Sequence, residues 1–97
     1  MHIERIRLKN FRNYENEEIE FHKRVNIILG NNAQGKTNLL ESVYITSLGK
    51  SFRTNKDAEM IRFEKDFAKI SADISIRNEN NTIDIVISDR GKYMQRV

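Results

Sequence analysis

The chain has 97 residues and a formal net charge of +3, so it can form one domain with a core of modest size and a mildly basic surface. It contains no cysteine and two histidines, a composition that excludes disulfides and thiolate metal sites. No apolar run approaches the roughly 18 residues of a membrane span, and the N-terminus lacks the apolar stretch of a secretory signal, so we expect a soluble, cytoplasmic protein.

The first 21 residues predict a β-hairpin. Ile6 and Leu8 alternate with basic residues, a period of two that is typical of a strand with one apolar and one basic face. Ile19 and Phe21 indicate a short second strand, which follows the polar stretch 13–16. We expect these two strands to pair with each other.

A buried strand and a helix are expected next, joined by a glycine-rich loop. Residues 25–29 are mostly β-branched and apolar, which is typical of a central strand. A helix is predicted from Lys36 to about Leu48, and Gly49 is a plausible end. The residues that recur at helical spacing, as on one face of a helix, are Leu39, Leu40, Val43, Tyr44 and Ser47.

A short helix is expected after this segment. Thr54 and Asp57 resemble a helix N-cap followed by an acidic residue at the third helical position. The residues of this helix that could face the core are Ala58, Met60 and Ile61.

The second half of the chain predicts an antiparallel meander. Apolar and polar residues alternate strictly over residues 68–76, and isoleucines alternate again over residues 83–87. Turn residues at 78–81 and 89–91 separate these strands from each other and from residues 92–97. Because the sequence stops within this last strand, we expect it to be a truncated part of a larger protein.

The P-loop pattern GxxxxGK(S/T) is matched without a mismatch by residues 30–37, which join the predicted strand to the predicted helix. Glycines let successive backbone N–H groups point into one concave nest, and a helix N-terminus adds unpaired donors. Lys36 is expected to lie against the β- and γ-phosphates of ATP, and the Thr37 hydroxyl to ligate Mg²⁺. The predicted cofactor-binding residues of the loop are Gly30, Asn31, Asn32, Ala33, Gln34, Gly35, Lys36, Thr37 and Asn38.

Hydrolysis of ATP would need an acidic residue that helps to hold Mg²⁺ and a group that orients the attacking water. Residues 85–89 imitate an apolar strand that ends in an acid, but their alternation is that of a half-exposed antiparallel strand, so Asp89 is not expected to be catalytic. The other acidic residues considered, each expected on the solvated surface, are Glu41, Asp57, Glu59 and Glu64. We therefore assign no catalytic residue and expect the chain to bind ATP but hardly to hydrolyse it.

Three segments together resemble the RecF family, bacterial DNA-repair ATPases related to SMC proteins and ABC ATPases. They are "IRLKNFRNYENEEIEF", "GNNAQGKTNLLESVY" and "SLGKSFRT", in this order and spacing. The resemblance implies an α/β fold, the N-terminal lobe of a P-loop NTPase head with a mixed sheet around the P-loop helix and an antiparallel meander. Residues 1–97 would be the N-terminal part of this head, without its remainder, the Walker B acid, the signature motif and the helical arm.

The resemblance also implies a function in DNA replication, repair, recombination and the SOS response to DNA damage. RecF-like proteins bind single-stranded and double-stranded DNA in an ATP-dependent way, act with RecO and RecR to load RecA at gaps, and sandwich ATP within a homodimer. The full-length family is weakly active as a DNA-dependent ATPase. By the same similarity Arg12 and Asn13 would lie near the phosphates or ribose, and Arg53 would approach the nucleotide or the partner subunit.

Other interpretations stay open. The chain could be the P-loop lobe of another SMC-like ATPase or of a small-molecule kinase, although such kinases usually continue with alternating parallel strands and helices. It could also be a scaffold whose loop retains a structural phosphate. A basic strand face could neutralise DNA phosphates, but nearby glutamates favour a solvated face; its residues are Arg5, Arg7 and Lys9, with Lys23 and Arg24. His2 and His22 lack the spacing of metal ligands and are expected to have no role in function. The phenylalanines expected in the core are Phe11, Phe21, Phe52 and Phe67.

Overall fold

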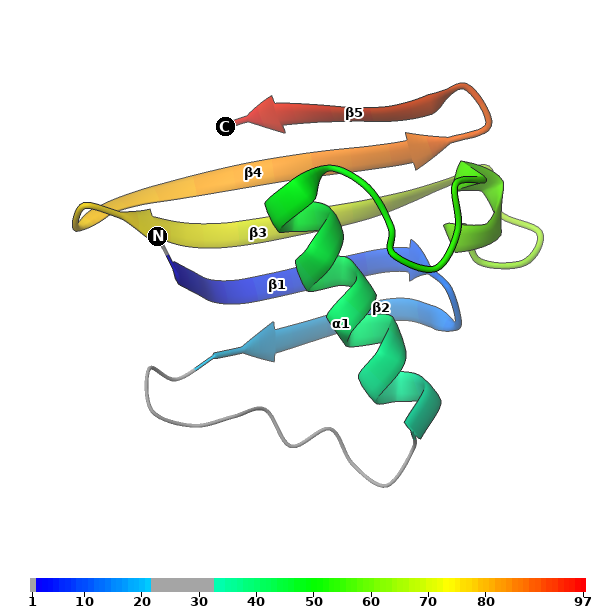
Figure 1. Cartoon of the computed structure of the whole chain (residues 1–97), viewed down its shortest axis with the longest axis horizontal. Helices are drawn as coiled ribbons and strands as arrows, with labels where there is room; N and C mark the ends of the chain where they lie inside the picture. The colour runs from blue at the N-terminus through cyan, green and yellow to red at the C-terminus, as the bar shows by residue number, and fades with distance from the viewer. Residues whose placement is uncertain (1, 22–32) are drawn as a thin grey trace.

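The fold is given by a computed structural model that describes residues 2–21 and 33–97, the first four residues of the second range by their backbone alone. Its sheet has five strands in the order β2-β1-β3-β4-β5, with one long helix across one face (Figure 1). The elements are β1 (His2–Phe11), β2 (Tyr14–Glu20), α1 (Ala33–Leu48), the short 3₁₀ helix η1 (Asp57–Met60), β3 (Phe67–Ile76), β4 (Glu79–Ser88) and β5 (Gly91–Arg96).

Every neighbouring pair of strands in this sheet is antiparallel. The predicted hairpin and the predicted meander are both confirmed, and β1 joins them by pairing with β3, Ile6 opposite Ala72. The central strand predicted at residues 25–29, which would make the sheet mixed, lies outside the described residues. Within the described residues, no helix is both long and apolar enough to cross a membrane.

The β1–β2 and β3–β4 hairpins turn earlier than the sequence suggested. β2 begins at Tyr14, because Phe11 already pairs with Tyr14, so the polar stretch 13–16 belongs mostly to the strand. β4 begins at Glu79, and the β3–β4 turn consists of Arg77 and Asn78, with φ angles of 51° and 66°. Two left-handed residues fit the twist of a two-residue hairpin loop, and that preference replaces the longer turn predicted at 78–81.

The core lies between the sheet and α1. Alternate residues of the three central strands point to this face and are fully or almost fully buried: Ile6 and Leu8 of β1, Ala68, Ile70, Ala72 and Ile74 of β3, and Ile85 and Ile87 of β4. Ile45 of α1 and Met60 of η1 complete the cluster with Phe11. Burying an isoleucine, leucine, methionine or phenylalanine stabilises the fold by roughly 1.5–3 kcal/mol each, so the residues that alternate along these strands contribute substantially to its stability.

The phenylalanines divide between core and surface. Phe11 is buried and Phe21 packs against the core, as expected. For Phe52 and Phe67 the expectation is wrong, because 49% and 38% of their surface is exposed. Phe52 lies after the end of α1, where its ring and the Tyr44 ring form a T-shaped pair at a centroid distance of 5.2 Å.

Helix α1 begins three residues before the predicted Lys36, at Ala33, and ends as predicted at Leu48, followed by Gly49 at φ 76°. The earlier start agrees with the good helix propensity of alanine and glutamine. The face that α1 buries differs from the predicted set: Leu39 is buried, but Leu40 is 60% exposed and Ser47 is exposed. Four polar residues are buried instead, namely Asn38, Glu41, Ser42 and Thr46.

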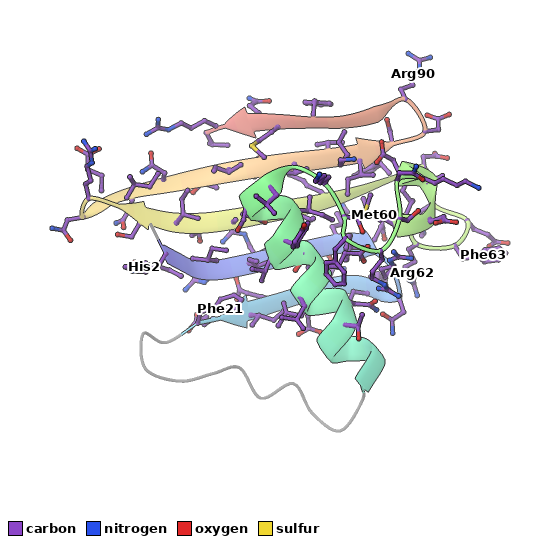
Figure 2. The ribbon with its side chains drawn as sticks, in the orientation of Figure 1. His2, Phe21, Met60, Arg62, Phe63 and Arg90 are labelled. Carbon is purple, nitrogen blue, oxygen red and sulfur yellow. The ribbon has the colours of Figure 1, made fainter. Side chains whose placement is uncertain are left out.

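The short helix after α1 also differs in detail. It is a single 3₁₀ turn whose preceding residue is Lys56, and no side chain caps it, so Thr54 is not its N-cap. The Thr54 hydroxyl instead accepts a hydrogen bond from the Lys56 amide at 2.9 Å. Met60, labelled in Figure 2, is fully buried, as expected, whereas Ala58 is exposed.

Candidate nucleotide-binding site

The structure places residues 33–37, the second part of the P-loop motif, at the start of α1. Ala33, Gln34, Gly35 and Lys36 form the first helical turn, whereas Gly30, Asn31 and Asn32 lie outside the described residues. The first turn contains no acidic residue, so no carboxylate there opposes an anion at the positive end of the helix. Thr37 is half-buried and Asn38 is 1% exposed.

The β1–β2 turn lies against the second turn of this helix. Asn38 donates a hydrogen bond through Nδ2 to Asn13 Oδ1 at 2.8 Å. Arg12 has φ 55°, and its amide donates to the Met60 carbonyl at 2.8 Å, which ties the turn to η1. Arg12, Asn13 and Asn38, three predicted site residues from distant parts of the sequence, are thus brought together.

Glu41 is the buried centre of this region. Its side chain is 0% exposed, and its two carboxylate oxygens accept hydrogen bonds from Arg12 Nε and Nη2 at 2.8 and 2.7 Å. Such a bidentate pair fixes the plane of the guanidinium as well as its position. Arg12 Nη1 also donates to the Glu59 carbonyl at 2.8 Å, so the guanidinium bridges α1 and η1.

The segment after α1 adds two more donors to the same carboxylate. Ser51 Oγ donates to Glu41 Oε2 at 2.5 Å, and Arg53 Nη1 lies 3.2 Å from Glu41 Oε1. Arg53 Nη1 also donates to Asn38 Oδ1 at 2.7 Å. Turn, helix and following segment are therefore held together by one carboxylate and two guanidiniums, whose formal charges sum to one positive charge.

The environment keeps Glu41 ionised. Burial alone would raise the pKa of Glu41, but the hydrogen bonds from Arg12 and Ser51, with the charges of Arg12 and Arg53, outweigh it, and the pKa is lowered. The hydrogen bond to Glu41 is likewise the main reason why the pKa of Arg12 is raised, against a smaller opposing effect of burial. The cluster therefore keeps its charges at neutral pH.

The expectation that Glu41 is a solvated surface residue is wrong. Glu41 lies three residues after Asn38 and four before Ile45, on the buried side of α1. That spacing was available in the sequence, but the arginines that compensate a buried carboxylate are far away along the chain. The other acids agree better with the expectation: Glu59, Glu64 and Asp89 are exposed, and Asp57 is half-buried, with Lys92 Nζ at 2.5 Å.

An open hollow of about 770 Å³ adjoins this cluster. Arg12, Asn13 and Asn38 line one side, and residues 59 and 61–65 line the other. Phe63 lies at the outer part of this loop and is 86% exposed (Figure 2). Residues 61–65 show no periodic pattern, so the sequence did not predict that they line a hollow beside Arg12.

The basic strand face is largely neutralised by acidic neighbours. Arg5 Nη2 donates to Glu20 at 2.7 Å, and Arg7 makes two hydrogen bonds to Asp73, at 2.8 and 3.1 Å. Lys9 Nζ lies 5.8 Å from the centre of the Phe67 ring. Arg5 and Arg7 are thus paired with acids, as expected for a solvated face, and Lys9 is exposed. Lys23 and Arg24 lie outside the described residues.

Comparison with known proteins identifies the family. The model of the RecF/RecN/SMC N-terminal domain matches residues 2–96. The chain belongs to this family. This match and the solved structures described next confirm two expectations, the resemblance to RecF and the fold of a P-loop NTPase lobe.

Individual relatives agree with this assignment. The chain is 54% identical to the DNA replication and repair protein RecF of Clostridium acetobutylicum and 47% identical to that of Bacillus velezensis, each over 92 residues and 95% of this chain. Two solved structures, of the recombination mediator protein RecF-ATPrS and RecF-ATP in the RecFOR pathway, match 98% of the chain at 33% identity, with TM-scores of 0.87 and 0.86. The chain spans only 25% of the two RecF sequences and 26% and 27% of the two structures.

Proposed function

We propose that this chain is the ATP-binding lobe of a RecF-like DNA replication and repair protein. The observation that carries the proposal is its likeness to RecF-ATP over 98% of its residues, together with the complete P-loop motif at residues 30–37. The arrangement of α1 and the β1–β2 turn supports it, because both place polar groups around the end of the helix at which a phosphate would bind.

The P-loop residues have distinct roles in this proposal. The amides of residues 30–37 would surround the phosphates, and Lys36 would balance their charge. Thr37 would offer its hydroxyl to Mg²⁺, a hard cation that takes oxygen ligands and keeps several waters. Asn13, held by Asn38, would lie beside the same phosphates or the ribose.

The residues fit ATP and Mg²⁺ by their chemistry. The first turn of α1 carries a lysine and no acid, and Thr37 supplies one oxygen ligand. Within the described residues no cluster of three or more histidine, aspartate or glutamate side chains could hold a metal by itself. Mg²⁺ would arrive with the nucleotide, whose phosphates would supply further oxygen ligands.

Binding without efficient turnover is the expected activity of this chain. The one acid at the end of an apolar strand, Asp89, is exposed in the β4–β5 turn. Its exposure supports the inference that it neither orients water nor holds Mg²⁺. Bound Mg-ATP would then serve as a structural ligand of this lobe.

The wider role proposed for the whole protein follows from the relatives. We infer that it acts in the cytoplasm in DNA repair and recombination and binds single-stranded and double-stranded DNA in an ATP-dependent way. It would form an ATP-dependent homodimer and act with RecO and RecR to assist RecA loading at gaps during the SOS response. Support comes from the RecF relatives and from the RecFOR pathway of the matching structures.

Thermal unfolding tests the nucleotide-binding part directly. A ligand that binds only the folded state stabilises it by mass action, by roughly 2.7 kcal/mol at a hundredfold excess over Kd. We expect Mg-ATP to raise the Tm of the chain and Lys36→Ala to abolish the rise. An unchanged Tm at millimolar Mg-ATP in the wild-type chain would overturn the proposal.

A further inference from the structure

Glu41 occupies a position that nucleotide binding by the P-loop does not explain. It is fully buried in α1, five residues after the P-loop lysine, and it accepts hydrogen bonds from Arg12, Ser51 and Arg53. A buried carboxylate carries a desolvation cost that close cationic partners must offset. Its partners come from the β1–β2 turn and from the segment after α1. Both segments also bind Asn38, the turn through Asn13 and the segment after α1 through Arg53.

We propose that Glu41 is a positioning residue of the nucleotide site, which fixes the Arg12 guanidinium so that its remaining donors face the phosphates of a nucleoside triphosphate. The inference rests on the proposed function and extends it to a residue outside the P-loop. Glu41 does not touch the nucleotide; it acts through Arg12.

The donor count of Arg12 supports this role. A guanidinium has five N–H groups, and the hydrogen bonds to Glu41 and to the Glu59 carbonyl use the Nε hydrogen and one on each terminal nitrogen. One N–H on each terminal nitrogen is left by these three bonds. The Arg12 side chain is 18% exposed and lines the hollow beside Asn13 and Asn38, so an anion in the hollow can reach it.

The charge balance points to the same class of ligand. Glu41 neutralises one of its two guanidinium partners, Arg12 and Arg53. The charged residues that line the hollow also sum to one positive charge, with Arg12, Arg62 and Lys65 against Glu59 and Glu64. Without the carboxylate the two guanidiniums would repel each other, and each would keep only its single bond to Glu59 O or Asn38 Oδ1, which fixes its plane less than a bidentate pair does. An anchored guanidinium also loses less conformational entropy on binding a ligand than a mobile one.

A purely structural clip would use the same contacts, so the test must separate stability from binding. The Kd of Mg-ATP is measured calorimetrically on the full chain, at a temperature where near-ultraviolet circular dichroism shows each variant to be folded. Glu41→Gln keeps the side-chain shape and removes the charge. We expect it to weaken Mg-ATP binding roughly tenfold to a hundredfold, the usual effect of losing one charge-assisted hydrogen bond to the ligand.

The dependence on Arg12 is tested by a double-mutant cycle. Arg12→Lys keeps the charge but loses the bidentate geometry, and we expect it to weaken Mg-ATP binding to a similar extent. When Arg12→Lys is already present, adding Glu41→Gln should change the Kd less than about twofold. If Glu41→Gln does not fold, Glu41→Asp, which keeps the charge one methylene shorter, takes its place, with a smaller loss and the same coupling expected.

Asp73→Asn is the matched control, because Asp73 also forms a bidentate pair with an arginine, Arg7, but lies apart from the hollow. Its Kd for Mg-ATP should equal that of the wild type. Suppose that the wild type binds Mg-ATP in a Lys36-dependent way. An unchanged Kd in Glu41→Gln, or additive effects of the two substitutions in the cycle, would then overturn this inference alone. Loss of binding by the wild type itself would overturn the proposed function.

Discussion

Arg12 and Glu41 are separated by 29 residues along the chain, yet they form a bidentate ion pair in which one partner is completely buried. The pair joins the β1–β2 turn to the middle of the P-loop helix. Ser51 and Arg53 extend the pair to the segment that follows the helix. One carboxylate therefore contacts all three segments, which the bonds of Asn38 to Asn13 and Arg53 also join.

The stability of the fold should depend strongly on that carboxylate. Glu41→Gln leaves two guanidiniums without their counterion, and breaking a buried pair in this way typically costs about 3–5 kcal/mol. Because Arg12 and Arg53 are 18% and 25% exposed and can rehydrate, we expect a loss of about 2–4 kcal/mol in the free energy of unfolding. Urea titration measures it. Glu15→Gln, at an exposed position of β2, is the control and should change stability by less than about 0.5 kcal/mol.

Stability should fall on acidification. The pKa of Asp73 is lowered mainly by its hydrogen bond from Arg7. For Glu41 the largest single effect is burial, which raises the pKa, but the hydrogen bonds from Arg12 and Ser51 and the arginine charges together outweigh it and lower the pKa. A carboxyl group whose pKa is lower in the folded state than in the unfolded state stabilises the fold at any pH above its unfolded-state pKa. This stabilisation is lost as the pH falls through the folded-state pKa. With ordinary values of 4.5 for glutamate and 3.8 for aspartate, the loss should begin near about pH 5 and continue below it.

The measurement for this pH dependence is the urea midpoint between about pH 7 and pH 3, in the wild type and in Asp73→Asn. The variant should show a shallower decline, because one of the two groups no longer titrates. The pKa values of Arg7 and Arg12 are raised and do not enter this window. A wild-type stability that rose on acidification would contradict the ion pairs described.

Two adjacent leucines test which face of α1 is buried. Leu39 is 1% exposed and Leu40 is 60% exposed. Leu39→Ala removes buried methyl groups and should cost about 2–5 kcal/mol, whereas Leu40→Ala should cost less than about 1 kcal/mol. Equal losses, measured by thermal or urea unfolding, would show that the helix is rotated relative to this description.

The β3–β4 turn offers a stabilising substitution. Arg77 has φ 51° and Asn78 has φ 66°, and a residue other than glycine, asparagine or aspartate in this region is strained by roughly 1–2 kcal/mol. The double change Arg77→Asn with Asn78→Gly supplies the pair that this turn prefers. It should raise the free energy of unfolding by about 0.5–1 kcal/mol.

Asn80→Gly, two residues further along in β4, is the matched control for that turn. Glycine in a strand interior should lower stability by about 0.5–1 kcal/mol. If both substitutions changed the unfolding free energy in the same direction, the turn would not have the left-handed geometry described.

Local patterns in the sequence predicted the features that depend on residues close together along the chain, such as strand faces and the start of a helix. The alternation in β1, β3 and β4 reports which side of each strand meets the core, so the buried isoleucines could be identified. The P-loop motif indicated the start of a helix, although the helix begins earlier, at Ala33. The turns lie one or two residues before the predicted positions, because the pairing register of the strands decides where a hairpin closes and local sequence patterns do not reveal that register.

What the sequence did not predict depends on contacts between distant residues. Glu41 was assigned to the surface because its partners, Arg12 and Arg53, lie in other segments, and without them a buried carboxylate is implausible. Leu40 was grouped with Leu39 because apolar character alone does not say which side of a helix is buried. The contact between Asn13 and Asn38 likewise exists only once the β1–β2 turn folds against α1.

The central claim is that the segment around the start of α1 binds the phosphates of ATP, and backbone amide NMR tests it most directly. Titration of the chain with Mg-ATP should shift the amide resonances of residues 30–38 and those of Arg12 and Asn13. The β3–β4 turn at Arg77 and Asn78 should stay unchanged, and Lys36→Ala should abolish the shifts. Saturating Mg-ATP that left residues 30–38 unperturbed, or that shifted only resonances elsewhere, would contradict the account.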